Sequence, residues 1–398
     1  MNILVLTRTT SFHYRGGFED HIDTLYEGLA KCGHKITVIT TRHPDGIAST
    51  ERNGVEFRFL ESTIPMTYSN EWWTESVAET NRLLQEESFD VIHSQSMGAW
   101  ALLKKKPALP VIVSMHGTNY DEYCTRRNVL QYQRADWTEY VKNFVRWKKD
   151  YYFRDRLTFS KADFYIATSN EQKHIFSRVY GVNPNKIRVV YNGMDVSHFS
   201  PQPKNTDLLE KYKLQNRFVI LVLARLEIDK GVQFMLDAMP SIIRDFPNST
   251  LLVVGSGGYE TELKAQADRL KISDHVVFAG KVPFDALPAY FNLADVFVNF
   301  TIRQHGYDLT MVEAMACEKP VIASFIGSHP TLIRHRQNGI LIAVEKTGLI
   351  AESIKDLIRS PALRQDMGRS GRNTILSQFT SRHMIESTEA LFKELCHI

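Results

Sequence analysis

Two cations follow an apolar run in the second half of the chain, and their spacing suits a diphosphate ligand. The run FVILVLA ends at Ala224, Arg225 comes next, and Lys230 follows five residues later, just before an expected helix. Such cations would neutralise phosphate charge, and the free N–H groups at the start of the helix would add a favourable dipole. Two solvated surface charges are the alternative interpretation.

A second candidate segment, RQHGYDLTMVEAMA, joins a glycine turn to an expected helix over Asp308–Ala316. Asp308 is a candidate N-cap residue. The backbone N–H groups from Gly306 to Leu309 would point outward and could hold anionic or hydroxyl oxygens. Glu313, within the helix, could accept hydrogen bonds from a ribose diol. An ordinary exposed glutamate is the alternative.

A third segment, VVGSGGYE, places Gly255, Gly257 and Gly258 between a buried strand and a helix. The pattern is similar to a dinucleotide fingerprint, but Glu260 occupies the last glycine position of G-x-G-x-x-G. A tight turn is therefore favoured over a NAD site, and a NAD-dependent dehydrogenase is the less favoured alternative.

The elements that must position these residues follow from short apolar runs that alternate with helical patterns. Runs without alternation are typical of parallel strands that are covered by helices on both faces. Helices are expected over Phe18–Ala30 and Val232–Phe246, the second with a kink at Pro240. The expected strands are Asn2–Thr7, Ile36–Thr40, Asp90–His93, Pro110–Met115, Asp163–Thr168, Ile187–Tyr191, Phe218–Ala224, Thr250–Val254, Val276–Ala279, Asp295–Asn299, Pro320–Ala323 and Gly339–Ile342.

This order predicts an α/β fold of two Rossmann-like, doubly wound domains that face each other across a cleft. The stretch SHFSPQPKNTD has the composition of a linker. We therefore predict a first domain over residues 1–197 and a second over residues 198–379. A C-terminal helix at about residues 380–398 is expected to pack back on the first domain.

Composition narrows the function classes. The 398 residues carry a formal net charge of +3, which does not by itself imply nucleic acid. The sequence lacks an apolar run of about 18 residues, and its start resembles a strand more than a signal peptide. The four cysteines are far apart and fit neither a disulfide framework nor a zinc site. A cytoplasmic protein is the simplest expectation.

The motifs together resemble retaining glycosyltransferases of family 4 (glycosyltransferase group 1), which have the GT-B fold. The resemblance covers nearly the whole chain and is more specific in the second half. It rests there on ARLEIDKG, VVGSGG, FAGKVPFDALPAYFNLADVFVNF, HGYDLTMVEAMACEKPVIAS and RQNGILI, and in the first half on GGFEDHIDTLYEGLAKCGHKITVIT, DVIHSQS, VSMHGT, ADFYIATSN and VVYNGMD.

The resemblance implies roles for residues of the second half. Arg225 and Lys230 would bind the donor diphosphate and act in catalysis, and Glu313 would bind the ribose. The backbone near Val282 would read the nucleobase. The other donor-binding candidates are His305, Gly306, Tyr307, Asp308 and Leu309.

In the first half, the resemblance implies that the turn at Gly16 and Gly17 approaches the phosphates closely, where a side chain would interfere. His116 would lie near the donor sugar as a third catalytic residue, although a lone histidine at a strand end is more often structural. His21 would lie on the acceptor side.

Three positions depart from the family's pattern. His305 replaces the first glutamate of E-x7-E, Asp308 stands where glycine is usual, and Thr331 stands where glutamate is common. A histidine supplies no fixed negative charge. The departure at His305 leaves the donor sugar, and activity itself, open.

The implied activity is a hexosyl transfer, with retention, from a nucleotide-diphosphate sugar to a sugar, lipid or small-molecule acceptor. We expect no cofactor and no metal, because protein cations would meet the diphosphate and an aspartate pair for a divalent cation is not evident. A nucleotide-sugar epimerase or hydrolase, and a catalytically silent nucleotide-sugar-binding protein, remain alternatives. Nucleic acid is not an expected partner.

The segment Asn119–Lys161 mixes eleven aromatic residues with basic ones. A long, partly buried helix with solvated cations is the favoured interpretation. An interfacial amphipathic helix, with weak peripheral contact at the inner membrane face, is the alternative.

Overall fold

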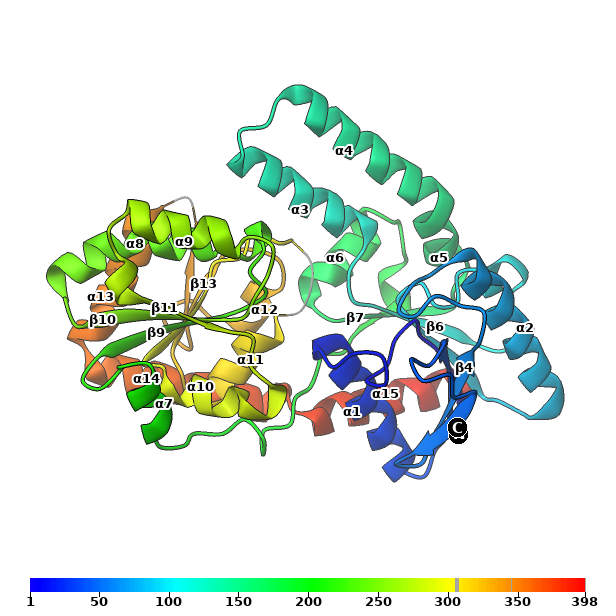
Figure 1. Ribbon diagram of the computed structural model, residues 1–398. Helices are drawn as coiled ribbons and strands as arrows, with labels where there is room; N and C mark the ends of the chain where they lie inside the picture. Colours follow the sequence, from blue (N-terminus) through cyan, green and yellow to red (C-terminus); the bar gives the residue numbers. More distant parts are fainter. Residues whose placement is uncertain (305–307, 345, 398) are drawn as a thin grey trace. The chain divides into compact units, whose positions relative to one another are not determined.

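The protein forms two α/β units in a computed structural model that describes residues 1–304, 308–344 and 346–397 (Figure 1). The first unit comprises Met1–Tyr123, Thr138–Met194 and Thr380–Ile398. The second comprises Cys124–Trp137 and Asp195–Phe379. The first boundary lies three residues before the predicted one, and the second coincides with it. The sequence did not predict that residues 124–137 group with the second unit.

The first unit is built on an eight-stranded sheet with the strand order β3-β4-β2-β1-β5-β6-β7-β8. Its pairs are parallel except β3 with β4, which is antiparallel. The strand order reverses between β1 and β5, which are neighbours in space. The strands are β1 (Asn2–Leu6), β2 (Lys35–Thr41), β3 (Ser49–Arg52), β4 (Val55–Leu60), β5 (Val91–Gln95), β6 (Val111–Met115), β7 (Phe164–Ala167) and β8 (Ile187–Val189).

Helices cover both faces of this sheet. On one face, α1 (Gly17–Lys31) and α15 (Ser381–Cys396) pack on strand residues such as Ile3 and Val5. On the other face, α2 (Asn70–Glu86), α5 (Arg156–Lys161) and α6 (Asn170–Arg178) pack on residues such as Leu4. Burial on both faces explains why β1, β6 and β7 are mostly apolar.

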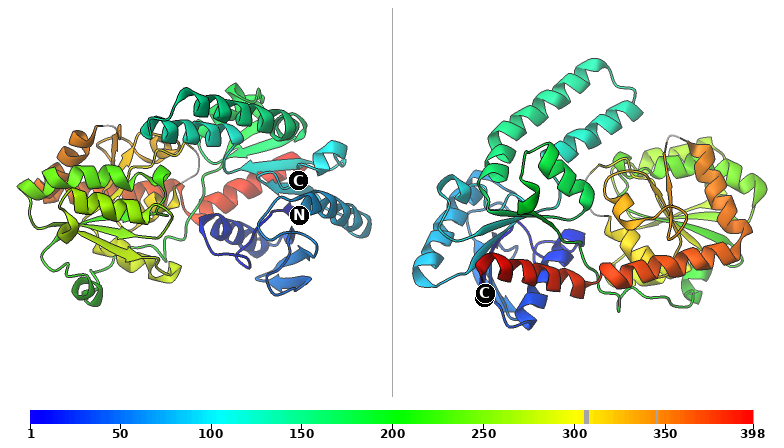
Figure 2. Two further views of the ribbon diagram at one scale, coloured as in Figure 1. Left: turned by 45° about the horizontal axis from the view of Figure 1, so that its top comes forward. Right: turned by 180° about the vertical axis from the view of Figure 1, so that it is seen from behind.

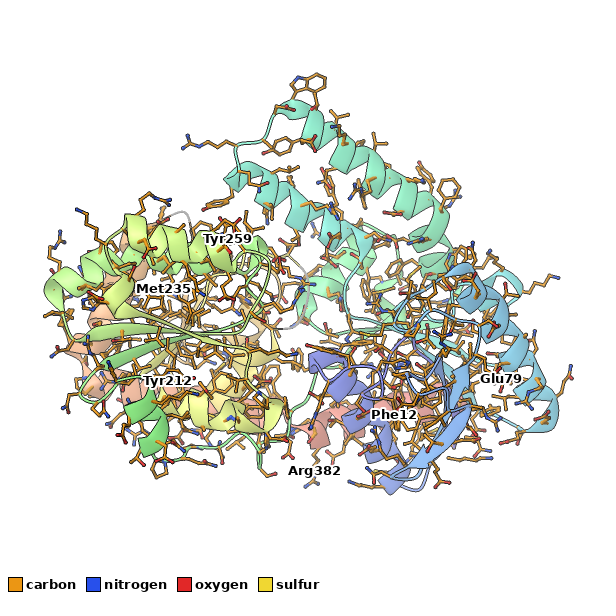
Figure 3. The ribbon with its side chains drawn as sticks, viewed as in Figure 1. Phe12, Glu79, Tyr212, Met235, Tyr259 and Arg382 are labelled. Atoms are coloured by element: carbon orange, nitrogen blue, oxygen red, sulfur yellow. The ribbon has the colours of Figure 1, made fainter. Side chains whose placement is uncertain are left out.

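The sequence analysis missed β3 and β4. In β4, buried Val55, Phe57 and Phe59 alternate with half-buried Glu56 and Arg58. This alternation, and the polar sequence STER in β3, differ from the continuous apolar runs that were sought. Phe12 packs edge-on against Phe57 and Phe59, with ring centroids 5.1 and 5.6 Å away (Figure 3).

The aromatic and basic segment forms several helical pieces instead of one long helix. They are α3 (Asn119–Tyr132), α4 (Trp137–Asp150), a π-helical turn (Tyr151–Asp155) and α5. The start of α3 packs on α4 through a stack of Tyr123 on Trp147, with centroids 5.0 Å apart. Much of the apolar surface of α4 is exposed, so the partly buried interpretation holds for one face of this helix.

The second unit contains a six-stranded parallel sheet with the order β11-β10-β9-β12-β13-β14. Its strand order reverses between β9 and β12. The strands are β9 (Phe218–Leu223), β10 (Ser249–Val254), β11 (Val276–Gly280), β12 (Val296–Asn299), β13 (Val321–Ser324) and β14 (Ile340–Ile342).

Helices α8 (Val232–Asp245), α9 (Glu260–Arg269) and α13 (Thr347–Arg359) cover one face of the second sheet. Helices α10 (Leu287–Leu293), α11 (Leu309–Ala316) and α14 (Pro361–Gln378) lie on the other (Figures 1 and 2). The helix α8 continues through Pro240, with buried residues such as Met235 and Ile242 before and after it. Two short helices, α7 (Thr206–Lys211) and α12 (His329–Leu332), complete the unit.

The C-terminal helix α15 packs on α1. A Cβ atom on Gly28 would lie 2.2 Å from Ile385 Cδ1, so glycine is required for this close approach. His34 Nε2 lies 2.8 Å from Glu389 Oε1, and Phe392 meets His93 edge-on at 5.0 Å. Arg382, near the start of α15, extends into solvent (Figure 3).

A search of the described helices for one both long and apolar enough to cross a bilayer found none.

Candidate functional site

The second unit gathers polar residues at the point where its strand order reverses. Lys230 follows β9, Asp308 follows β12, and β9 pairs directly with β12. In open parallel sheets, ligands bind beyond the carboxyl ends of the strands at such a reversal. Lys230 and Asp308 therefore stand where a ligand is expected on topology alone.

Lys230 and Asp308 are linked through a chain of buried polar contacts. Lys230 Nζ lies 3.3 Å from Asp308 Oδ1, and His329 Nε2 lies 2.8 Å from Asp308 Oδ2. The other ring nitrogen of His329, Nδ1, lies 2.7 Å from the carbonyl oxygen of Ser324. The lysine and aspartate side chains are only 13% and 15% exposed. Little freedom remains for the ammonium group, which is held at the sheet edge.

Asp308 remains ionised because of its neighbours. Burial alone would raise its pKa, but the positive charge of Lys230 and the hydrogen bond from His329 hold the pKa of Asp308 well below its usual range. Asp308 occupies the predicted N-cap position of α11, but among the described residues its side chain accepts no capping hydrogen bond from the start of that helix. The carboxylate is directed to Lys230 instead.

Sequence reasoning missed His329, although it lies in the same GSHPTLI stretch as Thr331. The available signal was its place in the loop that follows β13, where it begins α12 at the carboxyl edge of the sheet and where ligand-binding residues are expected. Its ring is 2% exposed. By fixing Asp308, His329 also fixes the position of Lys230.

The loop that carries Arg225 is shaped by the glycine-rich turn after β10. The N–H of Leu226 donates to Ser256 O over 3.0 Å. A Cβ atom on Gly255 would lie 1.8 Å from Ala224 O, and one on Gly257 would lie 2.3 Å from Leu226 O. These glycines therefore allow two backbone segments to touch, which is the tight-turn role that the sequence favoured over a dinucleotide site. Arg225 itself is exposed.

Gly231 connects Lys230 to α8 in a left-handed conformation, with φ 72°. A Cβ atom there would lie 1.8 Å from Phe300 O. The carbonyl oxygen of Asp229 accepts hydrogen bonds from Ile302 N, at 2.9 Å, and from Thr301 Oγ1, at 2.7 Å. The loop after β9 is thus tied to the loop after β12 on both sides of Lys230.

Three further candidates of the second unit lie at separate places. Glu313 is buried within α11, so it is not the ordinary exposed glutamate that was the alternative. Leu309 begins the same helix. Val282 lines a cavity of about 440 Å³ beside Tyr212 and Tyr290, whose hydroxyl oxygens lie 3.0 Å apart.

His305, Gly306 and Tyr307 lie outside the described residues, so the predicted roles of these three residues stay predictions.

In the first unit, the candidate residues again follow the central strands. Gly16 precedes α1 and Gly17 begins it, after the loop that follows β1. Gly16 has an extended backbone, with φ −151°, so its need for glycine is one of space. A Cβ atom would lie 2.9 Å from the Tyr14 ring and 3.1 Å from Glu19 Oε2. Burial raises the pKa of Glu19, whose side chain lies beside this turn.

His116 follows β6 and is held by side chains of β5 and α1. Its Nε2 lies 2.8 Å from Gln95 Oε1, and Gln95 Nε2 donates to Tyr26 Oη over 2.7 Å. Tyr26 Oη lies 2.8 Å from His93 Nδ1, and His93 Nε2 lies 2.7 Å from Ser114 Oγ. Burial, with lesser effects of His21 and His93, holds the pKa of His116 well below its usual range.

His21 of α1 faces His116, with ring centroids 4.8 Å apart and the rings nearly perpendicular. It is 8% exposed, and in the described part of the chain neither of its ring nitrogens has a hydrogen-bond partner. Burial lowers its pKa to about 4. The structure therefore brings together His21 and His116, two residues that the sequence placed at a substrate site.

A search of the described residues found no group of three histidine, cysteine, aspartate or glutamate side chains able to hold a metal ion.

Both units match families of glycosyltransferases. The family model "Glycosyltransferase Family 4" matches residues 15–198, and "Glycosyl transferases group 1" matches residues 205–374. Together they span most of the chain, which belongs to the group 1 glycosyltransferases of family 4 and has the GT-B fold. The predicted family and fold are confirmed.

Two relatives illustrate the range of similarity. The chain is 31% identical over 194 residues to a GDP-mannose-dependent α-(1-6)-phosphatidylinositol monomannoside mannosyltransferase of Mycobacterium tuberculosis. That match covers 47% of this chain, which spans about half the length of the mannosyltransferase (50%). An uncharacterized glycosyltransferase of Methanocaldococcus jannaschii is 24% identical over 391 residues, covering 95% of this chain and 94% of the relative.

Solved structures share the whole fold at low identity. Sucrose-phosphate synthase of Thermosynechococcus elongatus has a TM-score of 0.79 and 20% identity, with 99% of this chain and 98% of that chain covered. HepE of Anabaena has a TM-score of 0.75 and 19% identity, with 99% and 100% covered.

Proposed function

We propose that the protein transfers a hexosyl group, with retention of configuration, from a nucleoside-diphosphate hexose to a lipid-linked acceptor. The observation that carries the proposal is the placement of Lys230, held by Asp308 at the strand reversal of the second sheet, two residues before α8 begins. A diphosphate meeting Arg225 and Lys230 would gain both their charges and the N-terminal dipole of that helix.

In the proposed reaction, the bond between the anomeric carbon and the phosphate oxygen breaks while an acceptor hydroxyl bonds to the same face of that carbon. The acceptor proton passes to the departing phosphate oxygen. The transition state has oxocarbenium character, so stabilising the leaving diphosphate matters more than a strong nucleophile. Arg225 and Lys230 supply that stabilisation without a metal ion or a cofactor. His116 contacts the donor sugar, and His21 lies toward the acceptor.

The donor candidates come from relatives and neighbours. The mannosyltransferase similar to this chain is named for GDP-mannose, and a structure of the neighbour HepE contains UDP-glucose. A thermal-shift panel of GDP-, UDP-, ADP- and TDP-hexoses tests the proposal first. We expect one nucleotide series to raise the midpoint of unfolding, and NMR of the product to show the anomeric configuration of the donor.

Other outcomes of that panel favour the other candidates. Release of free sugar or an epimer from the donor, without transfer to any acceptor, would favour an epimerase or hydrolase. Binding of the donor without turnover, across soluble and lipid-linked acceptors, would favour a silent binding protein.

The lipid-linked acceptor is proposed from the surface of α4. Of the 15 large hydrophobic residues exposed in the described chain, seven lie between Tyr132 and Phe153. Val145 is 59% exposed, Tyr152 60% and Phe153 70%. Clustering of exposed apolar side chains is unusual on a surface that faces water, and it is typical of a docking surface.

Positive charge accompanies this apolar surface. The 21 residues from Arg134 to Arg154 contain six cations and three acids, a net +3 that equals the formal net charge of the whole chain. On α4, Lys142, Arg146 and Lys149 project beside the exposed apolar stripe of Val141, Phe144 and Val145. Aromatic and basic side chains on adjoining faces of one helix suit the headgroup region of an anionic membrane.

Vesicle flotation tests this contact. We expect binding to phosphatidylglycerol-containing vesicles and little binding to phosphatidylcholine alone. Lys142→Ala with Arg146→Ala should weaken binding by roughly 30-fold, at about 1 kcal/mol for each cation near an anionic surface. Phe153→Ser should weaken it too. Arg382→Ala and Leu363→Ser, which remove an exposed cation and an exposed leucine elsewhere, are the matched controls. The membrane contact would be refuted if all variants floated equally with the vesicles, or if the wild-type protein did not float with them.

A further inference from the structure

Four side chains connect the interior of the first unit to His116 through continuous hydrogen bonds. From the inside outward they run from Ser114 to His93, Tyr26 and Gln95, with heavy-atom distances of 2.7 to 2.8 Å at each step, including the last step to His116. His93 and Gln95 are completely buried, and Tyr26 is 1% exposed. Buried polar groups of this kind must all find partners, so the chain has few alternative arrangements.

The direction of each hydrogen bond follows from the single proton of the Tyr26 hydroxyl. Because Gln95 Nε2 donates to Tyr26 Oη, the phenolic proton is directed to His93 Nδ1. His93 then carries its own proton on Nε2 and donates it to Ser114 Oγ. At the other end, Gln95 Oε1 can only accept, so His116 carries its proton on Nε2.

His93 and His116 are both neutral near pH 7. Each imidazole therefore carries a single ring proton, which can be on either Nδ1 or Nε2. Burial lowers the pKa of His93 to about 3, and burial also holds the pKa of His116 well below its usual range. A neutral imidazole has one donor nitrogen and one acceptor nitrogen. Reversing the proton on His116 would require turning the Gln95 amide and reversing every other bond in the chain. His93 and His116 must therefore both carry their protons on Nε2 or both on Nδ1.

We propose that Tyr26, His93 and Gln95 are positioning residues that hold the ring proton of His116 on Nε2, so that Nδ1 is presented as a hydrogen-bond acceptor to a hydroxyl group of the bound sugar. The proposal rests on the proposed function for the identity of that ligand. The orientation of the ring is fixed as well, because Phe18 and His21 each meet it edge-on with centroids 4.8 Å away.

Nitrogen-15 NMR of histidine-labelled protein at pH 7.5 tests the proton positions without any activity measurement. We expect His93 and His116 both to carry the proton on Nε2 in the wild type. In Tyr26→Phe the phenolic link is lost, the Gln95 amide can turn, and His116 should become a mixture of both tautomers. Tyr165→Phe is the matched control, since Tyr165 is a buried tyrosine of β7 in the same unit, and its hydroxyl donates to the backbone carbonyls of Thr158 and Ala162.

A wild-type His116 protonated on Nδ1, or a Tyr26→Phe spectrum identical to that of the wild type at His116, would overturn the proposal. Kinetics provide the second measurement, with the nucleoside-diphosphate hexose that gives the largest thermal shift. We expect kcat/KM to fall about fivefold to tenfold in Tyr26→Phe, as for one lost hydrogen bond, and to be unchanged in Tyr165→Phe. Equal rates in the two variants would refute the positioning role. Absence of transfer in the wild type would refute the proposed function instead, and the NMR result would still decide the proton positions.

Discussion

Lys230 and Asp308 form an ion pair at the reversal point of the second sheet, with 3.3 Å between Nζ and Oδ1. The lysine predicted to bind a diphosphate is thus already paired with the carboxylate of Asp308. Asp308 stands at the position where the family usually has glycine. An incoming diphosphate would meet a negative charge behind the cation that is meant to bind it.

Asp308→Asn should strengthen the binding of a nucleoside diphosphate. The amide oxygen can still accept from His329, while the charge that repels phosphate is removed. We expect the Kd of GDP or UDP, whichever binds, to fall about fivefold in titration calorimetry, equivalent to about 1 kcal/mol. Asp274→Asn, an exposed change of the same charge in the same unit, is the control. Weaker binding in Asp308→Asn would show instead that the carboxylate is needed to orient Lys230.

Arg225→Ala and Lys230→Ala should each lower kcat by about 10²–10³-fold, by comparison with the removal of one oxyanion-hole donor. Their stabilities should differ, because Arg225 is exposed whereas Lys230→Ala leaves Asp308 buried without its cation. We expect a lower Tm for the lysine variant only. Lys264→Ala, which removes an exposed lysine of α9, serves as the control in both assays. Full transfer activity in both site variants would rule out the proposed phosphate site.

Gly231→Ala should destabilise the second unit by about 2–4 kcal/mol, because the new Cβ atom would lie 1.8 Å from Phe300 O in a backbone with φ 72°. Gly280→Ala provides an unusually close control. Its φ is 73°, but the space around the new Cβ atom is open, so it should cost only about 1 kcal/mol. Denaturant unfolding of both variants measures the difference. Equal losses would mean that the contact with Phe300 is not rigid.

The first unit should lose stability as the pH falls from about 6.5 to 4. His21 has its pKa lowered by burial to about 4, so its contribution is fully present above the unfolded pKa of 6.5 and is lost as the pH falls toward 4. The loss is about 3 kcal/mol for His21. His93 acts in the same direction, with its pKa lowered to about 3.

Two buried carboxyl groups oppose this trend over part of the range. Burial raises the pKa of Asp121 and of Asp155 to about 6, so each makes the folded state relatively more stable as the pH falls through 6. The histidine shifts are larger, and a net loss is expected. His21→Leu should reduce the slope of stability against pH, because up to one fewer proton is taken up on unfolding. The unfolding midpoint between pH 4 and 8 measures this slope. A slope unchanged by this substitution would contradict the role assigned to His21.

Much of the fold could be predicted because its strands are buried on both faces. Runs such as Asn2–Thr7 and Thr250–Val254 have continuous apolar centres, and each is a strand in the structure to within one residue at either end. Strands β3 and β4 were missed because they lie at one edge of the first sheet, where one face of β4 is only half-buried and the apolar pattern alternates. The segment after Asn119 proved to be separate helices, because the chain turns between α3 and α4 at Arg134, whose φ of 54° cannot continue an α-helix.

The sequence by itself determined the α/β architecture, the family and the order of the candidate residues along the chain, since these depend on hydrophobic periodicity and local spacing. Only the tertiary structure decided which polar groups meet. Asp308 and His329 are 21 residues apart, and Tyr26 and Gln95 are 69 apart, yet each pair is joined by a hydrogen bond. The first contact arises because parallel strands bring their carboxyl ends to one edge, and the second because α1 packs on the sheet. Spacing along a chain carries no record of which of these groups become neighbours.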